Sequence, residues 1–281
     1  MSTAALIEQP DTRLQLVTDR MVGGRVISCW GAAGSGKTTA TVNLGFELAS
    51  LGKRVLIVDL DSYRPSIAAL LGLVNSGPGI TAVLRLAKAG RLTLQELERL
   101  GEELSFGKTS LQVVTGLKSP TRWPELDGDG ISELFRFARE NFDFVLVDVA
   151  SELEEGLFSQ TSNVPRNFAA SEAIRLSDLA LGFFSADPVG VNRFLSDLRD
   201  AGFEFWPIAN RVRSSVLGRN PERQVRDTMF KIAQLKIHTT IAEDGAAMDI
   251  SQQRGQPLLM AAKSSKAREA LRLLALEIAD H

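Results

Sequence analysis

The sequence is poor in the side chains that build disulfides and most metal centres. Its 281 residues include one cysteine, Cys29, and two histidines, His238 and His281. A single thiol forms neither an internal disulfide nor a multi-cysteine iron–sulfur site, and two histidines so far apart do not indicate zinc. We therefore expect a protein of the reducing cytoplasm that holds no cysteine-bound cluster.

Long hydrophobic runs and an excess of charge of either sign are also missing. The apolar runs are well short of the roughly 20 residues that span a bilayer, and residues 1–20 are charged where a signal peptide needs an apolar stretch. Lys and Arg total 32 and Asp and Glu 34, a net charge of −2. The overall charge therefore requires neither nucleic acid nor an anionic membrane as a partner, and any such surface would be a local patch.

What the sequence does contain is a regular alternation of short apolar runs with helical patterns. We expect strands at 26–30, 54–59, 111–114, 144–148, 179–184, 203–209 and 236–241, and helices at 38–51, 92–104, 131–141, 191–201, 221–233 and 264–279. Segments 73–90 and 151–168 are expected to be long loops. Continuous apolar strands that alternate with helices indicate a mostly parallel sheet covered on both faces. The prediction is a single three-layer α/β domain over residues 24–281, preceded by an N-terminal arm, residues 1–23.

A glycine-rich loop lies between the first expected strand and the first expected helix. It satisfies G-x-x-x-x-G-K-[ST] with Gly31, Ala32, Ala33, Gly34, Ser35, Gly36, Lys37 and Thr38. Backbone N–H groups of such a loop converge on phosphate oxygens, and the helix N-terminus adds partial positive charge. Lys37 would reach the β- and γ-phosphates and the Thr38 hydroxyl would ligate Mg²⁺. A turn that binds nothing is the alternative, but the flanking strand and helix favour ATP with Mg²⁺.

Carboxylates end two further strands of the expected sheet. Asp148 closes the strand in FDFVLVD, the place of a Walker B aspartate that holds the Mg²⁺ shell. Asp59 and Asp61 end the strand in VLIVDLD. One of these two would position the attacking water or the metal, while the other would only hold the loop. Ligands of parallel α/β sheets collect at these strand ends, so the placement supports a functional role.

In this order, the motifs resemble those of the MinD/ParA family of P-loop ATPases. The resemblance rests on the phosphate loop with its GKTT ending, on VLIVDLDSYRPS, on FDFVLVDV and on the pair Asn210-Arg211, and it runs from about Val26 to the C-terminus. It is closest to the CpaE/TadZ-like branch. The family's fold is the P-loop NTPase fold, and its members bind ATP and Mg²⁺.

The resemblance also implies roles for individual residues. Thr39 would join the phosphate loop in binding the nucleotide, and Asn210 would contact the adenine edge. Lys37 and Asp61 would act in hydrolysis, with Asp61 as the switch I aspartate. Thr38, Asp61 and Asp148 would surround the metal.

One position departs from the family pattern. The family's loop carries an additional lysine that crosses to the partner's nucleotide in a dimer, and Ala32 stands at that position. A methyl group does not neutralise phosphate charge, and the loss of a trans-acting cation costs on the order of 10³-fold in rate for the comparable arginine finger. Arg64, Arg166 or Arg211 would be candidates for a substitute cation, and the sequence alone does not choose among them.

The leading hypothesis is a homodimeric, nucleotide-dependent positioning switch with weak ATPase activity. It would bind a protein partner and act at a cell pole, a septum, a pilus system or in DNA partition, as a cytoplasmic protein recruited by that partner. A nucleotide-binding scaffold with little or no hydrolysis is the alternative, because of Ala32. A metabolic P-loop enzyme ranks last, since the 151–168 segment carries one arginine rather than an arginine-rich lid.

Two segments of the sequence are candidate surfaces for other partners. Arg211, Arg213, Arg219, Arg223 and Arg226 form the most basic stretch and would serve non-specific DNA binding, although a solvated helix face explains them as well. The C-terminal helix ends Glu-Ile-Ala-Asp-His and lacks a basic rim. The sequence therefore argues against direct membrane binding and favours packing of this helix onto the sheet.

Overall fold

The computed structural model describes residues 23–107, 109–153, 158–159, 162–198 and 201–281. The expected N-terminal arm, residues 1–23, thus lies outside the described residues except for Gly23, and the division into arm and domain stays a prediction. The strands are β1 (Arg25–Gly31), β2 (Val55–Leu60), β3 (Glu102–Phe106), β4 (Thr109–Val114), β5 (Phe144–Val149), β6 (Phe158–Ser159), β7 (Ser162–Pro165), β8 (Leu179–Ser185), β9 (Trp206–Val212) and β10 (Thr239–Ala242).

Helices occupy most of the sequence between the strands. They are α1 (Lys37–Ser50), α2 (Ile67–Leu70), α3 (Ile80–Lys88), α4 (Leu94–Leu100), the 3-10 helix η1 (Pro120–Glu125), α5 (Gly128–Asn141), α6 (Phe168–Arg175), α7 (Pro188–Asp197), α8 (Ser214–Leu217), α9 (Pro221–Ala233), α10 (Gly245–Arg254), α11 (Leu258–Ala261) and α12 (Lys266–Asp280).

Eight strands form one sheet in the order β10-β9-β8-β1-β5-β2-β4-β3. All neighbouring pairs are parallel except β3–β4, which is antiparallel. The central strands β1, β2 and β5 are buried along nearly their whole length, because helices cover both faces of the sheet. The prediction of a single α/β domain with a mostly parallel sheet is confirmed.

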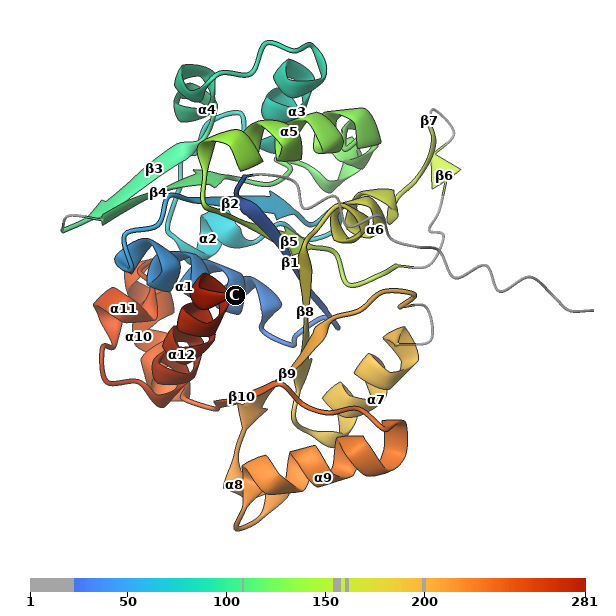
Figure 1. Ribbon diagram of the computed structural model, residues 1–281, viewed down its shortest axis with the longest axis vertical. Helices are drawn as coiled ribbons and strands as arrows, with labels where there is room; N and C mark the ends of the chain where they lie inside the picture. The colour runs from blue at the N-terminus through green and yellow to red at the C-terminus, as the bar shows by residue number, and fades with distance from the viewer. Residues whose placement is uncertain (1–22, 108, 154–157, 160–161, 199–200) are drawn as a thin grey trace, which may run out of the picture.

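The side chains of β1 alternate between two apolar layers. Val26 and Trp30 point into a core shared with α3, α5, α6 and α7, whereas Ile27 and Cys29 point into a core shared with α1, α10 and α12. Figure 1 shows the two groups of helices on opposite sides of the sheet, with α3, α4 and α5 above it and α1, α10, α11 and α12 below. The period of two along an extended strand creates this division.

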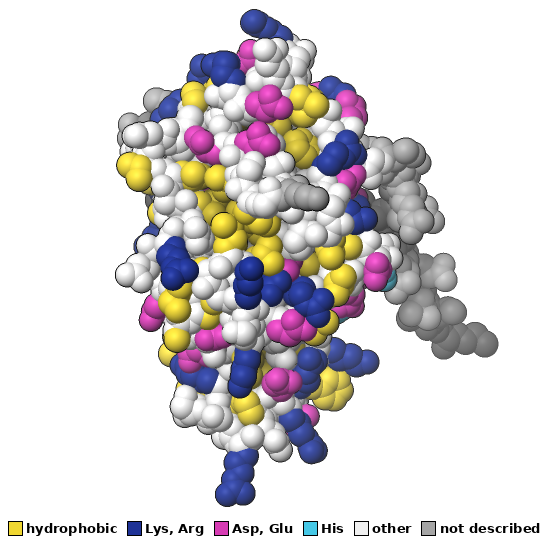
Figure 2. Space-filling view, turned by 90° about the vertical axis from the view of Figure 1, so that its left-hand side faces the viewer, with side chains coloured by type: hydrophobic (Ala, Val, Ile, Leu, Met, Phe, Trp, Pro, Cys, Tyr) yellow, Lys and Arg dark blue, Asp and Glu magenta, His cyan; other side chains and the backbone are white. Residues whose placement is uncertain are grey.

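The C-terminal helix packs onto the body of the protein, as expected. Helix α12 contacts α1 and β10, and it buries Leu271, Leu274, Ala275 and Ile278. Each large apolar side chain buried in this way contributes about 1.5–3 kcal/mol. On the face shown in Figure 2, Lys and Arg side chains are interspersed with Asp and Glu. Among the described residues, no helix combines the length and apolar character needed to cross a bilayer.

Three element predictions were wrong. The helix expected over 92–104 ends at Leu100 in α4, because Gly101 leaves the helical conformation and β3 then pairs with β4. The loop expected over 73–90 contains helix α3, which buries Val83 and Leu84 against α5. Its short length and the glycine-rich lead-in masked the helical spacing of its apolar residues. The second expected loop, 151–168, also contains the short strands β6 and β7.

Candidate nucleotide-binding site

The carboxyl ends of five neighbouring strands bring the predicted site residues to one edge of the sheet. The pairing of β2 with β5 sets Asp59 beside Asp148, and the pairing of β1 with β5 sets Asp148 beside Cys29, two residues before the phosphate loop. On the other side of β1, the pairing of β8 with β9 sets Ser185 beside Asn210. Residues from distant parts of the chain therefore meet around the loop between β1 and α1.

The phosphate loop depends on glycine at its two ends. Gly31 ends β1 with φ of 144°, and a Cβ there would lie 2.0 Å from the carbonyl oxygen of Phe183. Gly36, with φ of 85°, is the N-cap of α1, and the first turn of that helix contains no acidic side chain. Partial positive charge at this helix end is thus left available for an anion.

Within the loop, burial differs from residue to residue. Ala32 and Ser35 are buried, and a hydrogen bond from the Ser35 N–H to the Ala32 carbonyl, 3.0 Å long, closes the turn. Ala33 and Gly34, at the tip of the turn, are exposed. Thr39 is half-buried in the first turn of α1, where its carbonyl accepts a hydrogen bond from the Asn43 side chain.

Lys37 lies between two of the predicted carboxylates. Its Nζ is 3.2 Å from Asp61 Oδ2 and 3.7 Å from Asp148 Oδ1. The Thr38 hydroxyl donates a 2.7 Å hydrogen bond to the second oxygen of Asp148. The side chains of Lys37 and Asp61 are 9% and 8% exposed and that of Asp148 is fully buried, so the ammonium offsets part of the negative charge of the two carboxylates away from water.

The pKa values of these groups follow from burial and from their mutual contacts. Burial raises the pKa of Asp148 to about 6, although Lys37 and Thr38 oppose the shift. Burial also acts on Asp61, but Lys37 and the N–H groups of Arg64 and Tyr63 outweigh it and lower the pKa of Asp61. Burial alone would lower the pKa of Lys37, yet Asp148 and Asp61 reverse the direction and raise it.

The structure separates the roles of the two carboxylates in VLIVDLD. Asp59 accepts hydrogen bonds from the backbone N–H groups of Asp61, Ser66 and Ile67, so it holds the turn that follows β2. Its carboxyl is fully buried, and this burial raises its pKa to about 8. Asp61 instead presents one oxygen to Lys37, while its other oxygen accepts hydrogen bonds from the N–H groups of Tyr63 and Arg64. Asp61 is therefore the member of the pair that faces the phosphate loop.

The residues present fit a magnesium–nucleotide complex. The Ser35 hydroxyl and Asp148 Oδ1 are buried and have no hydrogen-bond partner in the part of the chain that the structure describes, which leaves polar atoms available beside the loop. The described residues contain no group of three or more His, Cys, Asp or Glu side chains able to hold a metal by themselves. A divalent cation would thus be held by Thr38 and nucleotide phosphates together, with Asp148 and Asp61 in its surroundings.

Asn210 lies directly over the phosphate loop. Its Nδ2 donates a 2.7 Å hydrogen bond to the carbonyl of Ser35, and its Oδ1 accepts one of 2.8 Å from the N–H of Arg211. Arg211 has φ of 55°, a left-handed conformation that is uncommon for a residue with a side chain. The predicted contact of Asn210 with adenine remains a prediction, but its place beside the loop is clear.

Of the three arginines proposed as substitute cations, Arg166 makes the most extensive contacts. The side chains of Arg64 and Arg211 are exposed. Arg166 is half-buried, donates from Nη2 to the carbonyl of Ser62 at 3.0 Å, and lies over the ring of Tyr63 with 3.8 Å between Cζ and the ring centroid. These contacts tie it to the segment that follows Asp61.

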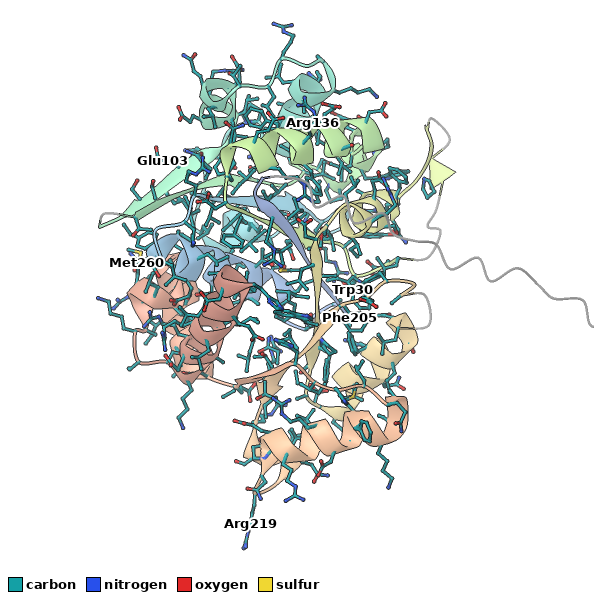
Figure 3. All side chains as sticks on the ribbon, in the orientation of Figure 1. Trp30, Glu103, Arg136, Phe205, Arg219 and Met260 are labelled. Atoms are coloured by element: carbon teal, nitrogen blue, oxygen red, sulfur yellow. The ribbon has the colours of Figure 1, made fainter. Side chains whose placement is uncertain are left out.

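The sequence analysis missed two further residues of this region. Trp30 immediately precedes the phosphate loop, and its indole N–H donates a 3.0 Å hydrogen bond to the carbonyl of Ser151, three residues after Asp148. Its ring packs against the ring of Phe205, the residue that directly precedes β9, as Figure 3 shows. Tyr63 was also overlooked; as the single tyrosine in the chain, two residues after Asp61, it was visible in the sequence.

The arginines of the expected DNA-binding stretch differ in their contacts. Arg213 pairs with Glu243 at 3.2 Å, Arg223 pairs with Asp227 at 3.4 Å, and Arg226 donates to the carbonyl of Ile237. Arg219 projects from the far end of the molecule (Figure 3). Three of the five side chains are thus engaged within the protein.

The chain is similar to known proteins over most of its length. The profile of the CobQ/CobB/MinD/ParA nucleotide binding domain matches residues 26–256. The chain belongs to this family. Curated relatives include the septum site-determining protein MinD of Synechocystis sp., 24% identical over 247 residues that cover 84% of this chain and 81% of the relative. MinD of Bacillus subtilis is 24% identical over 250 residues, which cover 86% and 84% of the two chains.

Solved structures of family members share the fold. A ParA family ATPase from Chlorobium tepidum superposes with a TM-score of 0.73 at 18% identity, covering 90% of this chain and 98% of that one. MinD from Pyrococcus horikoshii, solved with Mg-ADP, gives a TM-score of 0.68 at 22% identity and covers 91% and 96%. The MinD/ParA resemblance and the P-loop NTPase fold are therefore confirmed, and membership of the family implies that this domain binds a nucleotide.

Proposed function

We propose that this protein binds ATP with Mg²⁺ at the phosphate loop and hydrolyses it slowly. The observation that carries the proposal is the buried set of Lys37, Thr38, Asp61 and Asp148 around one loop. One ammonium and two carboxylates leave the set with excess negative charge, so triphosphate binding requires an added cation. Mg²⁺ held by Thr38 would supply that charge and would polarise the transferred phosphoryl group.

The protein's own residues would then act on the nucleotide. Lys37 would move its N–H donors from the carboxylates to the phosphates, and the loop's backbone N–H groups would hold the remaining oxygens. Asp61 would orient the attacking water from its place beside Lys37. Thr39 and Asn210 would line the nucleotide side of α1 and β9.

We further propose that ATP binding favours a homodimer that recruits a protein partner and positions it in the cell. Several relatives bear the name septum site-determining protein, and one solved relative is the MinC:MinD complex of Aquifex aeolicus. These names support a positioning role at a septum, and a cell pole or a pilus system is the alternative place that we propose. The protein would be cytoplasmic and would reach that place through its partner.

Ala32 favours a second candidate within the same site. Because the methyl group at this position is buried and uncharged, the loop offers no second cation to a nucleotide across a dimer. This candidate is a nucleotide-dependent scaffold with little or no hydrolysis. It would still respond to ATP binding, but it would not turn ATP over at an appreciable rate. DNA partition through Arg211, Arg213, Arg219, Arg223 and Arg226 is less well supported, since three of these side chains already pair with other groups of the protein.

Calorimetry and sedimentation test these proposals together. The wild type should bind ATP in the presence of Mg²⁺ and sediment as a dimer, whereas Lys37→Ala should bind at least about tenfold more weakly, because it loses charge-assisted hydrogen bonds to the phosphates. Lys88→Ala, which removes an exposed lysine of α3, is the matched control. Equal ATP affinity in the wild type and Lys37→Ala would refute the assignment of the site, and an unchanged association state with ATP would refute the dimer switch.

A further inference from the structure

A cluster of three side chains joins the two segments that leave the nucleotide site after Asp61 and after Asp148. Tyr63 belongs to the first segment, and Arg166 and Asn167 lie on the second, immediately before α6. The Tyr63 hydroxyl donates a 2.7 Å hydrogen bond to Asn167 Oδ1, and the Arg166 guanidinium covers the Tyr63 ring. None of these three side chains is among the groups proposed to bind ATP or Mg²⁺.

Hydrogen bonds connect the cluster directly to Asp61. The Tyr63 N–H donates to Asp61 Oδ1 at 2.8 Å, while Asp61 Oδ2 accepts from Lys37. Arg166 Nη2 donates to the carbonyl of Ser62, the residue between Asp61 and Tyr63. The position of the Asp61 carboxylate beside Lys37 therefore depends on the turn after Asp61. Arg166 contacts this turn at two consecutive residues, Ser62 and Tyr63.

The segment that follows Arg166 is well packed against the rest of the protein. Asn167 is 5% exposed, and α6 buries Ala169, Ala170 and Ala173 in the core that it shares with β1 and β5. The turn itself is buried at Ser62, which is 1% exposed. Contacts between two packed segments fix geometry better than contacts made by a mobile side chain on a surface.

Chemistry favours arginine at this position. A guanidinium can lie flat on an aromatic ring and at the same time donate in its own plane to a carbonyl, which a lysine ammonium cannot do. No carboxylate pairs with Arg166 among the ion pairs of the described residues. Among the described residues, Arg166 thus makes its hydrogen bond and its ring contact in the turn after Asp61, with Ser62 and Tyr63.

We propose that Arg166 is a positioning residue for Asp61: through Ser62 and Tyr63 it holds this carboxylate beside Lys37 and couples the turn after β2 to the start of α6. The proposal rests on the proposed ATP site and assigns it a control element. In this role Arg166 would contact neither the nucleotide nor the reacting atoms. Arg166 is one of the three arginines proposed from the sequence as substitute cations. Here its role is different, because it acts within its own chain by holding the backbone next to Asp61.

The single tyrosine allows the coupling to be observed directly. Protein labelled with 3-fluorotyrosine carries its label at Tyr63 alone, so one ¹⁹F resonance reports on the ring beneath Arg166. We would record this resonance with and without ATP and Mg²⁺ for the wild type, Arg166→Gln and Arg166→Lys. Arg175→Gln is the matched control, because it removes an exposed arginine at the other end of α6.

Saturation with ATP should shift the wild-type resonance. Both Arg166 variants should alter the nucleotide-free resonance and lose at least about half of the ATP-induced shift, while ATP affinity by calorimetry stays within about threefold of the wild type. Where turnover is measurable, Arg166→Gln should lower kcat by about tenfold or more with little change in KM, because misplacement of a group that acts in the transition state affects kcat. Arg175→Gln should match the wild type.

The possible failures can be told apart. If the wild type binds ATP but Arg166→Gln keeps the full ATP-induced shift and the wild-type kcat, Arg166 has no positioning role and the ATP site stands. A wild type that binds no ATP in calorimetry overturns the proposed function, and the positioning role with it. A circular dichroism spectrum and melting curve for each variant separate loss of coupling from loss of the fold.

Discussion

The side chain of Asn210 donates a hydrogen bond to the main-chain carbonyl of Ser35, 2.7 Å away and 175 positions earlier in the sequence. The contact joins the end of β9 to the phosphate loop. It also constrains Gly36, because a Cβ at that residue would lie 2.4 Å from Asn210 Nδ2. The conformation of the loop therefore depends on a residue from the second half of the chain.

A pair of glycine substitutions tests this dependence. Gly34→Ala and Gly36→Ala both place an alanine at positive φ, a strain of about 1–2 kcal/mol, but a Cβ at Gly34 meets no atom within 4 Å. We expect Gly36→Ala to lower the free energy of unfolding further, by about 1 kcal/mol more, since Asn210 must give up its hydrogen bond. Combining Gly36→Ala with Asn210→Ala should cost less than the sum of the two single changes. Additive losses in chemical denaturation would contradict the argument.

Thr38 allows metal-dependent binding to be separated from nucleotide binding. Its hydroxyl is placed by a hydrogen bond to Asp148, where it would also ligate Mg²⁺. We expect Thr38→Ala to lose most of the gain in ATP affinity that Mg²⁺ gives the wild type, a loss of about tenfold or more, equivalent to ~1.4 kcal/mol. Thr38→Ser keeps the hydroxyl and should keep that gain. An equal response to Mg²⁺ in the wild type and both variants, measured by calorimetric titration, would exclude Thr38 as a ligand.

The buried carboxyls predict how stability changes with pH. The pKa is raised from 3.8 to about 6 in Asp148 and to about 8 in Asp59, so each carboxyl binds more protons in the folded than in the unfolded protein. The stability that these groups contribute is complete below the unfolded value and is lost as the pH rises through the folded value. Asp61, whose pKa is lowered, affects stability only at more acid pH.

Thermal melting of the nucleotide-free protein checks this expectation. The melting temperature should fall between pH 5 and pH 8.5, and Asp59→Asn should reduce the fall, because the amide does not ionise and its oxygen still accepts the N–H groups of Ser66 and Ile67. Asp129→Asn, at an exposed carboxyl of α5, is the control and should follow the wild type. A fall in melting temperature that Asp59→Asn leaves unchanged would show that Asp59 does not contribute to it.

Replacing Ala32 by lysine should increase the rate of ATP hydrolysis. Ala32→Lys restores the charge that the family's loop carries at this position. We expect it to raise the rate of phosphate release by about tenfold or more, with the roughly 10³–10⁵-fold effect of an arginine finger as the upper limit. Because the cation would act across a dimer, the rate per protein should rise with protein concentration. Ala33→Lys, one residue along the exposed turn, is the control. No increase for Ala32→Lys over Ala33→Lys would show that the missing lysine does not limit turnover.

Local patterns in the sequence were enough to predict several parts of the site. The G-x-x-x-x-G-K-[ST] spacing identifies the phosphate loop because few loops need glycine, lysine and a hydroxyl in that order between a strand and a helix. The apolar runs ending in Asp59, Asp61 and Asp148 identify parallel strands and place their carboxylates at one edge of the sheet. Short-range periodicity failed at α3 and β3, where few residues carry the pattern and pairing with β4 decides the outcome.

The sequence by itself determined that this protein has a phosphate loop, a mostly parallel sheet and carboxylates at its strand ends, since each depends on residues close together in the chain. Only the tertiary structure decided which carboxylate faces Lys37 and which holds a turn, because Asp59 and Asp61 differ by the partners that folding brings to them. It alone also distinguished Arg166 from Arg64 and Arg211. That choice depends on contacts with Ser62 and Tyr63, 104 and 103 positions away, and composition and spacing carry no information on such distant pairs.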